Sequence, residues 1–171
     1  MNGIEVGLSL GSNIPDRLAY IRKARQAISE LGDATVLASA PMYETEPVDC
    51  PPAYRDNKFL NTVLIVGTSL DAHRFFQALQ GIERVVGRRR RLERNAPREI
   101  DIDLIYYDGQ TIRSGGLVVP HPRWTLRRFV LQPLSDVRGY LVLPGHDRRV
   151  RDILAALGPE GPKVAKVLET W

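Results

Sequence analysis

The most constraining feature of the sequence is an alternation of isoleucine and aspartate within residues 99–107, EIDIDLIYY. Side chains of a β-strand point alternately to opposite faces, so the two isoleucines share one face while Asp101 and Asp103 share the other. The Cα atoms of the two aspartates would lie roughly 6.5–7 Å apart. Carboxylates at this spacing raise each other's pKa when unpaired, but they can share one or two hard cations. The segment therefore predicts a strand with one apolar face and one acidic face that needs a positive partner.

A cluster of arginines precedes this strand. Residues 88–98 contain six arginines and a single acid, Glu93, within a chain of net charge +4. Taken alone, such a loop is equally typical of a solvated or nucleic-acid-binding surface and of a phosphate site. Two acids beside it would repel a nucleic-acid backbone. A nucleoside-triphosphate site needs both charges, because magnesium takes carboxylate and phosphate oxygens and arginines neutralise the remaining charge. The combination favours a magnesium-dependent phosphate enzyme.

Hydrophobic periodicity and turn residues predict the order of the elements. In chain order they indicate a strand at 4–10, a helix entered through GSNIPDR and closed by Gly32, an extended segment at 34–46, a strand at 59–70, a helix capped by Asp71 and ended by Gly87, and the strand at 99–107. This order is typical of an α+β domain of ferredoxin-like type, in which helices pack on one face of an antiparallel sheet. We expect a single domain over 1–171, with 158–171 as a candidate loose tail.

Composition and the absence of several motifs exclude some kinds of site and reaction. A chain of 171 residues can bury a core without disulfides, and the single cysteine excludes a disulfide framework or a CxxC site. The first residues show no secretory signal, and no segment has the length of a membrane span, so we expect a cytoplasmic protein. Neither GxxxxGK[ST] nor GxGxxG is present. No nucleophile stands out either, which favours in-line transfer driven by positioning and electrostatics.

Several motifs, in order, carry a resemblance to a known family. They are GSN at 11–13, YETEP at 43–47, FLN at 59–61, the stretch 82–105 ending in PREIDIDLI, and VPHPR followed by RRFVLQPL at 119–134. Over roughly residues 4–143 the chain resembles the 6-hydroxymethyl-7,8-dihydropterin pyrophosphokinases of folate biosynthesis. The arginine followed after two residues by Asp-x-Asp is the most specific part.

This resemblance implies an activity and its cofactors. Members of the family transfer the terminal pyrophosphate of ATP to the hydroxymethyl group of the reduced pterin and release AMP. Two magnesium ions would hold the triphosphate and the incoming oxygen together. The partners implied are the small molecules ATP and 6-hydroxymethyl-7,8-dihydropterin, with no nucleic acid and no membrane, and we expect a monomer.

The resemblance also implies roles for individual residues. By similarity, the metal ligands are Asp101 and Asp103, and the arginines that stabilise transferring charge are Arg88 and Arg98. The ATP side would comprise Gln80, Glu83, Arg90, Arg94, Arg98, His121 and Arg127, and the pterin side Thr45, Val48, Phe59, Asn61, Asn95 and Phe129. A flat pterin with an amide edge suits aromatic faces and an asparagine.

Some of these residues could instead have purely structural roles. Glu83 could pair with an arginine on its own helix, and Phe59 and Phe129 could be core residues. The chain departs from many relatives at Asn95, where they have a tryptophan that closes over the pterin, and at Pro122, where a tyrosine is frequent. Glycines at 115 and 116 stand where some relatives have a basic residue. These departures leave the closed-loop contacts open.

Two other functions compete with this interpretation. A small RNA-binding module would combine a ferredoxin-like sheet with an arginine-rich loop, although no RNP-like aromatic motif is present. A different magnesium-dependent phosphotransferase would release ADP or ignore pterins.

We also expect the loops at 44–58 and 87–97 to act as lids that exclude water once both substrates are bound.

Overall fold

The structure is a computed structural model that describes residues 3–47, 51–87 and 97–171. Its main sheet is antiparallel, with strand order β5-β1-β4-β3-β8 and with β2 also paired to β4. These strands are β1 (Ile4–Ser12), β2 (Ala34–Ser39), β3 (Met42–Thr45), β4 (Phe59–Thr68), β5 (Asp101–Tyr107) and β8 (Val164–Leu168). A separate hairpin pairs β6 (Ile112–Ser114) with β7 (Leu117–Val119).

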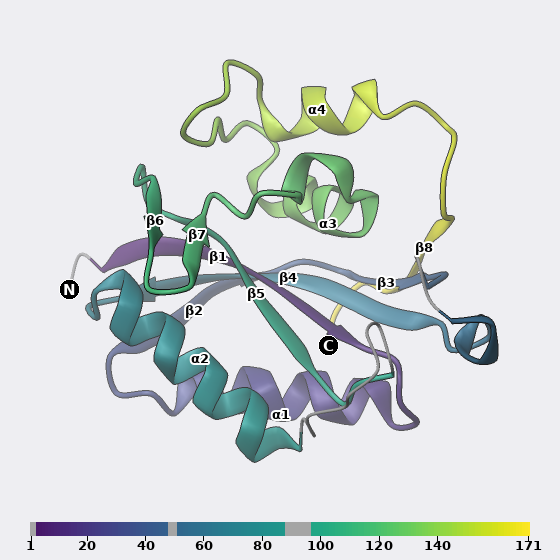
Figure 1. The fold of residues 1–171 in the computed structure, drawn as a ribbon, viewed down its shortest axis with the longest axis horizontal. Helices are drawn as coiled ribbons and strands as arrows, with labels where there is room; N and C mark the ends of the chain where they lie inside the picture. The colour runs from purple at the N-terminus through teal and green to yellow at the C-terminus, as the bar shows by residue number, and fades with distance from the viewer. Residues whose placement is uncertain (1–2, 48–50, 88–96) are drawn as a thin grey trace.

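Helices cover both faces of the sheet (Figure 1). On one face lie α1 (Arg17–Ser29) and α2 (Ala72–Val86), and on the other lie α3 (Arg128–Arg138) and α4 (Val150–Ala156). Each face has its own apolar cluster, the first built on α1 and α2 and the second on α3 and α4. The antiparallel ferredoxin-like sheet is confirmed, but the expectation of helices on one face was wrong, because two later helices bury the second face.

The first strand shows how the sequence divides the two faces. Val6, Leu8 and Leu10 are fully buried against the cluster on α1 and α2. The residues between them, Gly7, Ser9 and Gly11, are small and point to the face of α3. A Cβ atom added at Gly7 would lie 2.2 Å from the Tyr106 ring, so the missing side chain makes room for that ring. The small residues on this side of β1 leave space between the sheet and α3.

Helix boundaries follow the expected signals at α2 but not at α1. Asp71 caps α2 by accepting from two backbone N–H groups, and Gly87 ends it with a φ of 122°, as expected. The first helix begins at Arg17, after Asp16 in the left-handed region (φ 68°) and without a side-chain cap. It ends at Ser29 rather than at Gly32. α1 therefore begins without a side-chain cap and ends before the glycine that was expected to close it.

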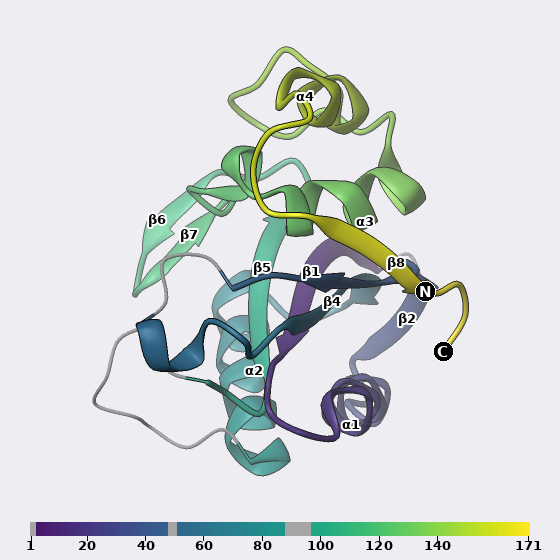
Figure 2. The same cartoon turned by 90° about the vertical axis from the view of Figure 1, so that its right-hand side faces the viewer.

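The C-terminal segment is part of the sheet, not a loose tail. Strand β8 pairs with β3, with Val164 opposite Thr45, and Figure 2 shows it at the edge of the sheet beside β3. Trp171 donates its indole N–H to the Ala40 carbonyl at 2.8 Å, and its own carbonyl accepts from Arg25 at 3.3 Å. The Arg25 guanidinium also lies 5.2 Å from the centre of the Trp171 ring. The last residue thus ties β8 to α1 and to the β2–β3 connection.

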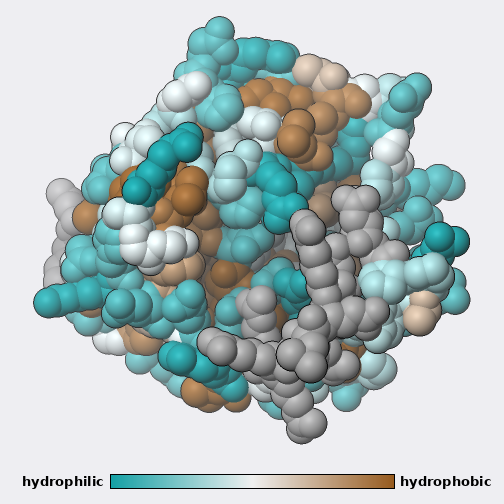
Figure 3. All heavy atoms as spheres, in the orientation of Figure 1, coloured by the Kyte–Doolittle hydropathy of each residue, from teal (hydrophilic) through white to brown (hydrophobic). Residues whose placement is uncertain are grey.

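On the face shown in Figure 3, hydrophobic side chains form several patches among hydrophilic ones, and one of these patches lies over α3 and α4. In the portion of the chain that the structure describes, none of the helices has both the length and the hydropathy needed to cross a bilayer.

Because Trp171 makes both a hydrogen bond and a cation–π contact, its truncation should destabilise the fold. We expect Trp171→Ala to lower the free energy of unfolding by about 2 kcal/mol, measured by urea denaturation followed by circular dichroism. Trp171→Phe, which keeps a ring for Arg25 but lacks the indole donor, should lose about 1 kcal/mol. Equal midpoints for Trp171→Ala and the wild type would show that the C-terminal contact contributes nothing.

Candidate active site

The two aspartates of β5 lie on the face of the sheet that α3 covers. Ile100, Ile102 and Leu104 are buried, whereas the side chains of Asp101 and Asp103 keep exposed fractions of 28% and 36%. This is the alternation expected from the sequence. In the sheet, the neighbours of the two aspartates on β1 are Gly11 and Ser9, whose small side chains leave the carboxylates uncovered.

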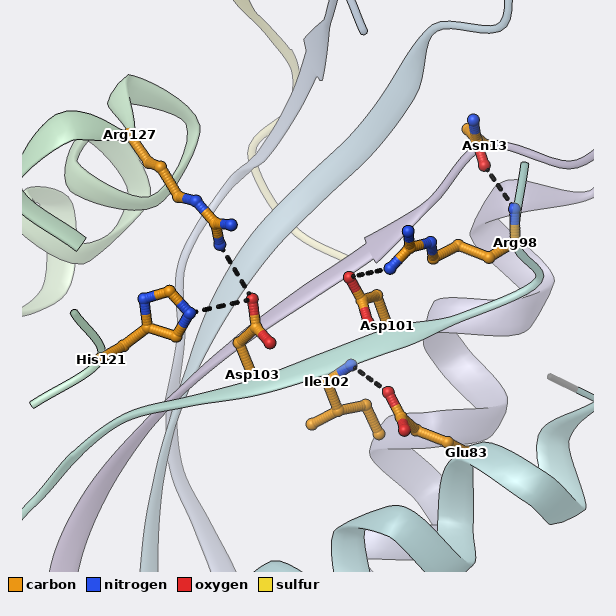
Figure 4. A network of polar contacts seen from close by, with 8 residues as sticks. All are labelled: Asn13, Glu83, Arg98, Asp101, Ile102, Asp103, His121 and Arg127. Carbon is orange, nitrogen blue, oxygen red and sulfur yellow. Dashed lines mark hydrogen bonds and ion pairs between the residues drawn. The ribbon is translucent and has the colours of Figure 1, made fainter. Parts of the chain in front are cut away.

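Asp101 is paired with the arginine at the start of its own strand. Arg98 donates to Asp101 Oδ2 at 2.9 Å (Figure 4). The backbone of Arg98 is held by Asn13, whose Oδ1 accepts from the Arg98 N–H at 2.8 Å and whose own N–H donates to the Arg98 carbonyl at 3.3 Å. The asparagine of the GSN motif therefore fixes the arginine that faces the first carboxylate.

Asp103 is paired with Arg127 and lies near His121, both from the segment that leads into α3. Arg127 donates to Asp103 Oδ2 at 3.0 Å, and His121 Nε2 lies 3.8 Å from the same oxygen, beyond hydrogen-bond range (Figure 4). His121 Nδ1 accepts from the Arg123 N–H, which leaves Nε2 to carry the proton of the neutral ring. Burial lowers the pKa of His121, and Asp103 partly opposes that shift. His121 is thus placed to donate a hydrogen bond from Nε2.

A buried glutamate connects α2 to β5. Glu83 Oε1 accepts from the Ile102 N–H at 2.8 Å, between the two aspartates (Figure 4), and the residue is only 8% exposed. Its contact with the β5 backbone differs from a simple ion pair along the helix surface. Gln80 lies one turn earlier on α2 and also lines the cleft.

A second group of predicted residues gathers where β3 ends and β4 begins. Thr45 and Phe59 are register partners, and Asn61 donates its amide to Thr45 Oγ1 at 2.7 Å. Thr45 and Asn61 are almost fully buried, whereas Phe59 is partly exposed. A Cβ atom added at Gly11 would lie 2.8 Å from Asn61 Oδ1, so this glycine makes room for the asparagine. Phe129 completes the group, with the Arg127 guanidinium 5.5 Å from its ring centre.

One cleft of about 1150 Å³ brings both groups together. Its lining includes these predicted residues: Thr45, Phe59, Asn61, Gln80, Glu83, Arg98, Asp101, Asp103, His121, Arg127 and Phe129. Phe59 and Phe129 are therefore cleft residues with partly exposed rings, not members of the closed core. The predicted residues Val48, Arg88, Arg90, Arg94 and Asn95 lie outside the described part of the chain.

The cleft also has lining residues that the sequence analysis did not select. They include Ser9, Gly11, Glu46, Phe76, Arg123, Arg128 and, from the C-terminal segment, Leu157, Glu160, Gly161, Pro162 and Val164. Arg123 follows His121 within the HPR motif, and Gly11 belongs to GSN, so both had a signal nearby. The C-terminal residues had none, because their place depends on a strand pairing with β3.

The carboxylate pair suits a magnesium ion better than a closed protein metal site. In the described ranges no group of three or more His, Cys, Asp and Glu side chains is arranged to hold a metal. Magnesium commonly takes one or two carboxylates and fills its other positions with phosphate oxygens and water. Two uncovered carboxylates in a cleft lined by arginines match that pattern.

Comparison with known proteins connects this cleft to one enzyme family. The family model described as 7,8-dihydro-6-hydroxymethylpterin-pyrophosphokinase matches residues 7–139. The chain belongs to this family. The 2-amino-4-hydroxy-6-hydroxymethyldihydropteridine pyrophosphokinase of Bacillus subtilis is 38% identical over 80% of the chain and 79% of the relative. The enzyme of the same name from Methylorubrum extorquens is 35% identical over 90% of the chain and 94% of the relative.

Other relatives are longer proteins. The folic acid synthesis protein fol1 of Pneumocystis carinii is 39% identical over 81% of the chain, which spans only 18% of that protein. Among solved structures, an HPPK-DHPS in complex with substrates shares the fold, with a TM-score of 0.72 at 13% identity, over 91% of the chain and 43% of the relative. The family thus assigns the pyrophosphokinase class in folate synthesis to this chain, and the structural likeness supports the fold.

The bond between Glu83 and the Ile102 N–H should contribute to stability. We expect Glu83→Ala to lower the free energy of unfolding by about 1–3 kcal/mol, because a buried N–H loses its acceptor. Glu83→Gln is the matched control, since its amide oxygen can still accept, and it should lose clearly less. The measurement is urea denaturation of both variants. Equal losses would mean that the charge of Glu83, not its contact with β5, carries the effect.

Proposed function

We propose that the cleft binds ATP with magnesium at β5 and 6-hydroxymethyl-7,8-dihydropterin beside β3 and β4, and transfers the terminal pyrophosphate of ATP to the pterin hydroxymethyl group. The observation that supports this most strongly is the continuity of one cleft from the carboxylates of Asp101 and Asp103 to the Thr45–Asn61 pair. A phosphate-binding half and a heterocycle-binding half on one sheet face suit a two-substrate transfer.

In this proposal the phosphate half works by charge and position. Arg98 and Arg127 offer guanidinium groups to phosphate oxygens, and the neutral ring of His121 adds a donor. Asp101 and Asp103 would hold magnesium, which supplies charge neutralisation for the triphosphate and the incoming alcohol. Gln80 and Glu83 lie on the α2 side of the same half. Arg88, Arg90 and Arg94 remain predictions for this half.

The acceptor half suits a flat heterocycle. Phe59 and Phe129 present partly exposed rings for stacking, while Asn61 offers an amide donor and acceptor for a polar ring edge. Thr45 orients Asn61 through the hydrogen bond to its Oγ1. Val48 and Asn95 remain predictions for this half.

The transfer itself is an in-line displacement. The pterin hydroxyl oxygen attacks the β-phosphorus of ATP and releases its proton to solvent as the new P–O bond forms, the bond from that phosphorus to the oxygen bridging the α-phosphate breaks, and AMP leaves. Arginines aimed at the phosphates stabilise the charge that develops on the transferring group. Holding both reactants in one cleft replaces a bimolecular encounter with a positioned one.

Further expectations concern the molecule as a whole. We propose that residues 1–171 act as a single pyrophosphokinase domain, in the cytoplasm and as a monomer, on small molecules and without a nucleic-acid partner.

Incubation with ATP, magnesium and the pterin tests the function. AMP that appears only with the pterin, in step with pterin diphosphate, supports it, whereas ADP or no nucleotide product contradicts it.

The carboxylates of β5 should be needed for turnover and not for folding. We expect Asp101→Asn and Asp103→Asn to unfold like the wild type but to lose at least about a hundredfold in AMP formation. Asp108→Asn is the matched control, because it removes the same charge just beyond β5 at a positive φ that asparagine tolerates. Chelation of magnesium should abolish wild-type turnover. Near-normal rates in either cleft variant would refute the metal assignment.

The space left by Gly11 should matter for the acceptor. The Cβ atom of Gly11→Ala would displace Asn61, so we expect the KM for the pterin to rise about tenfold while the KM for ATP stays the same. Gly109→Ala, whose Cβ would meet no atom within 4 Å, is the control. The assay is AMP release with each substrate varied in turn. An unchanged pterin KM in Gly11→Ala would remove Asn61 from the acceptor site.

A further inference from the structure

The acceptor half of the cleft has walls from two different layers of the fold. Thr45 and Asn61 belong to the sheet, whereas Phe129 belongs to α3. The space between these walls therefore depends on how α3 is held over β3 and β4. We propose that Tyr43, a buried residue of β3, is a positioning residue that sets this space through its hydrogen bond to Asp136 of α3. This inference rests on the proposed function and extends it to a residue outside the cleft lining.

Tyr43 lies directly beside the sheet residues of the acceptor half. It is the register partner of Asn61 on β4, and it precedes Thr45 by two positions, so the three side chains point to the same face of the sheet. Only 4% of Tyr43 is exposed. On its other side it pairs with Lys166 of β8, whose amine lies 6.0 Å from the centre of the tyrosine ring. The ring therefore has neighbours on both adjacent strands and keeps a fixed position in the sheet.

A carboxylate on α3 holds the Tyr43 hydroxyl. This hydroxyl donates to Asp136 Oδ2, and Gln132 donates to the other oxygen of the same carboxylate at 3.4 Å. Burial and the hydrogen bond to Asp136 raise the pKa of Tyr43, so the hydroxyl keeps its proton and remains a donor. Phe129, Gln132 and Asp136 recur at helical spacing along one face of α3. A fixed Asp136 therefore also fixes the rotation of α3 that presents Phe129 to the cleft.

The hydrophobic effect that packs α3 on the sheet is non-directional, so polar contacts fix the exact placement of the helix. Arg127, just before the helix, pairs with Asp103 of β5, and Arg138 in its last turn pairs with Glu5 of β1. In the described chain, the hydrogen bond of Asp136 reaches β3. Under the proposed function, Arg127 would turn from Asp103 to phosphate oxygens. The contact of Asp136 involves no substrate group, so it can hold α3 over β3 during that exchange.

Removal of the Tyr43 hydroxyl tests this role. We expect Tyr43→Phe to raise the KM for the pterin about five- to tenfold, with kcat and the KM for ATP unchanged, because the space around the heterocycle changes while the phosphate half keeps its groups. Tyr106→Phe is the matched control, since Tyr106 is also buried and donates to a carboxylate, but its partner Glu5 lies at the start of β1. An equal rise in both variants, or an unchanged pterin KM in Tyr43→Phe, would overturn the proposal.

Substitutions at Asp136 separate a positioning contact from general packing. Asp136→Asn keeps an oxygen that can accept from the Tyr43 hydroxyl, so the pterin KM should stay within about twofold of the wild-type value. Asp136→Ala should raise the pterin KM as much as Tyr43→Phe does. The double variant Tyr43→Phe/Asp136→Ala should be no worse than either single variant, since both changes remove the same bond. Additive effects would mean that the two side chains act independently and would refute the positioning role.

A measurement without substrate separates this inference from the proposed function. In hydrogen exchange, the backbone amides of α3 should exchange at least about threefold faster in Tyr43→Phe than in the wild type, relative to those of α1 on the opposite face of the sheet. Unchanged relative rates would overturn the role of Tyr43 while leaving the function intact. A wild type that forms no AMP would overturn the function, and the exchange rates would still decide whether Tyr43 holds α3.

Discussion

Two like charges on one face of a strand are the constraint on which the site depends. Asp101 and Asp103 would repel each other, and each carboxylate, partly removed from water, needs a partner. The partners come from different parts of the chain: Arg98 precedes β5, and Arg127 precedes α3. Each ion pair therefore also connects a chain segment to β5. The Arg98 pair holds the residues just before β5, and the Arg127 pair holds the entry to α3. The second pair thus adds a polar contact at the entry to α3, while the apolar packing of Val130, Leu131 and Leu134 holds the helix on the sheet.

The cleft exists because the strand next to β5 has almost no side chains on that face. Ser9 and Gly11 lie opposite Asp103 and Asp101 and leave the space above them open. Gly11 also lies beside Asn61 on β4. The same small residue therefore leaves space both next to Asp101 and next to Asn61. Larger residues at these positions would fill the junction between phosphate and acceptor. The volume of the cleft therefore depends on the small residues of β1, although none of their side chains carries chemistry.

Local patterns predicted what depends on local physics. The period of two in residues 99–107 placed Asp101 and Asp103 on one face, and Asp71 and Gly87 marked the ends of α2, because strand alternation and helix capping involve near neighbours. The start of α1 was wrong because Asp16 adopts a left-handed conformation that composition does not reveal. β8 was missed because its stability comes from pairing with β3, far away in the sequence. Glu83 was selected by resemblance, while its contact with the Ile102 N–H required the packing of α2 on β5.

Under the proposed function, the ion pairs of the site would couple the binding of nucleotide and metal. Arg98 and Arg127 each donate a hydrogen bond to Asp101 and Asp103 in this structure, and another cation at the carboxylates would free these donors for phosphate oxygens. The carboxylates in turn gain little from a cation alone, because it would lie beside two guanidinium groups. A triphosphate alone would meet two carboxylates. In that proposal, magnesium and triphosphate together would provide partners for all four side chains, and each exchanged pair would cost little, since exposed or half-exposed ion pairs contribute about 0–1 kcal/mol. The proposed complex of magnesium and triphosphate would therefore replace the resting pairs at little cost.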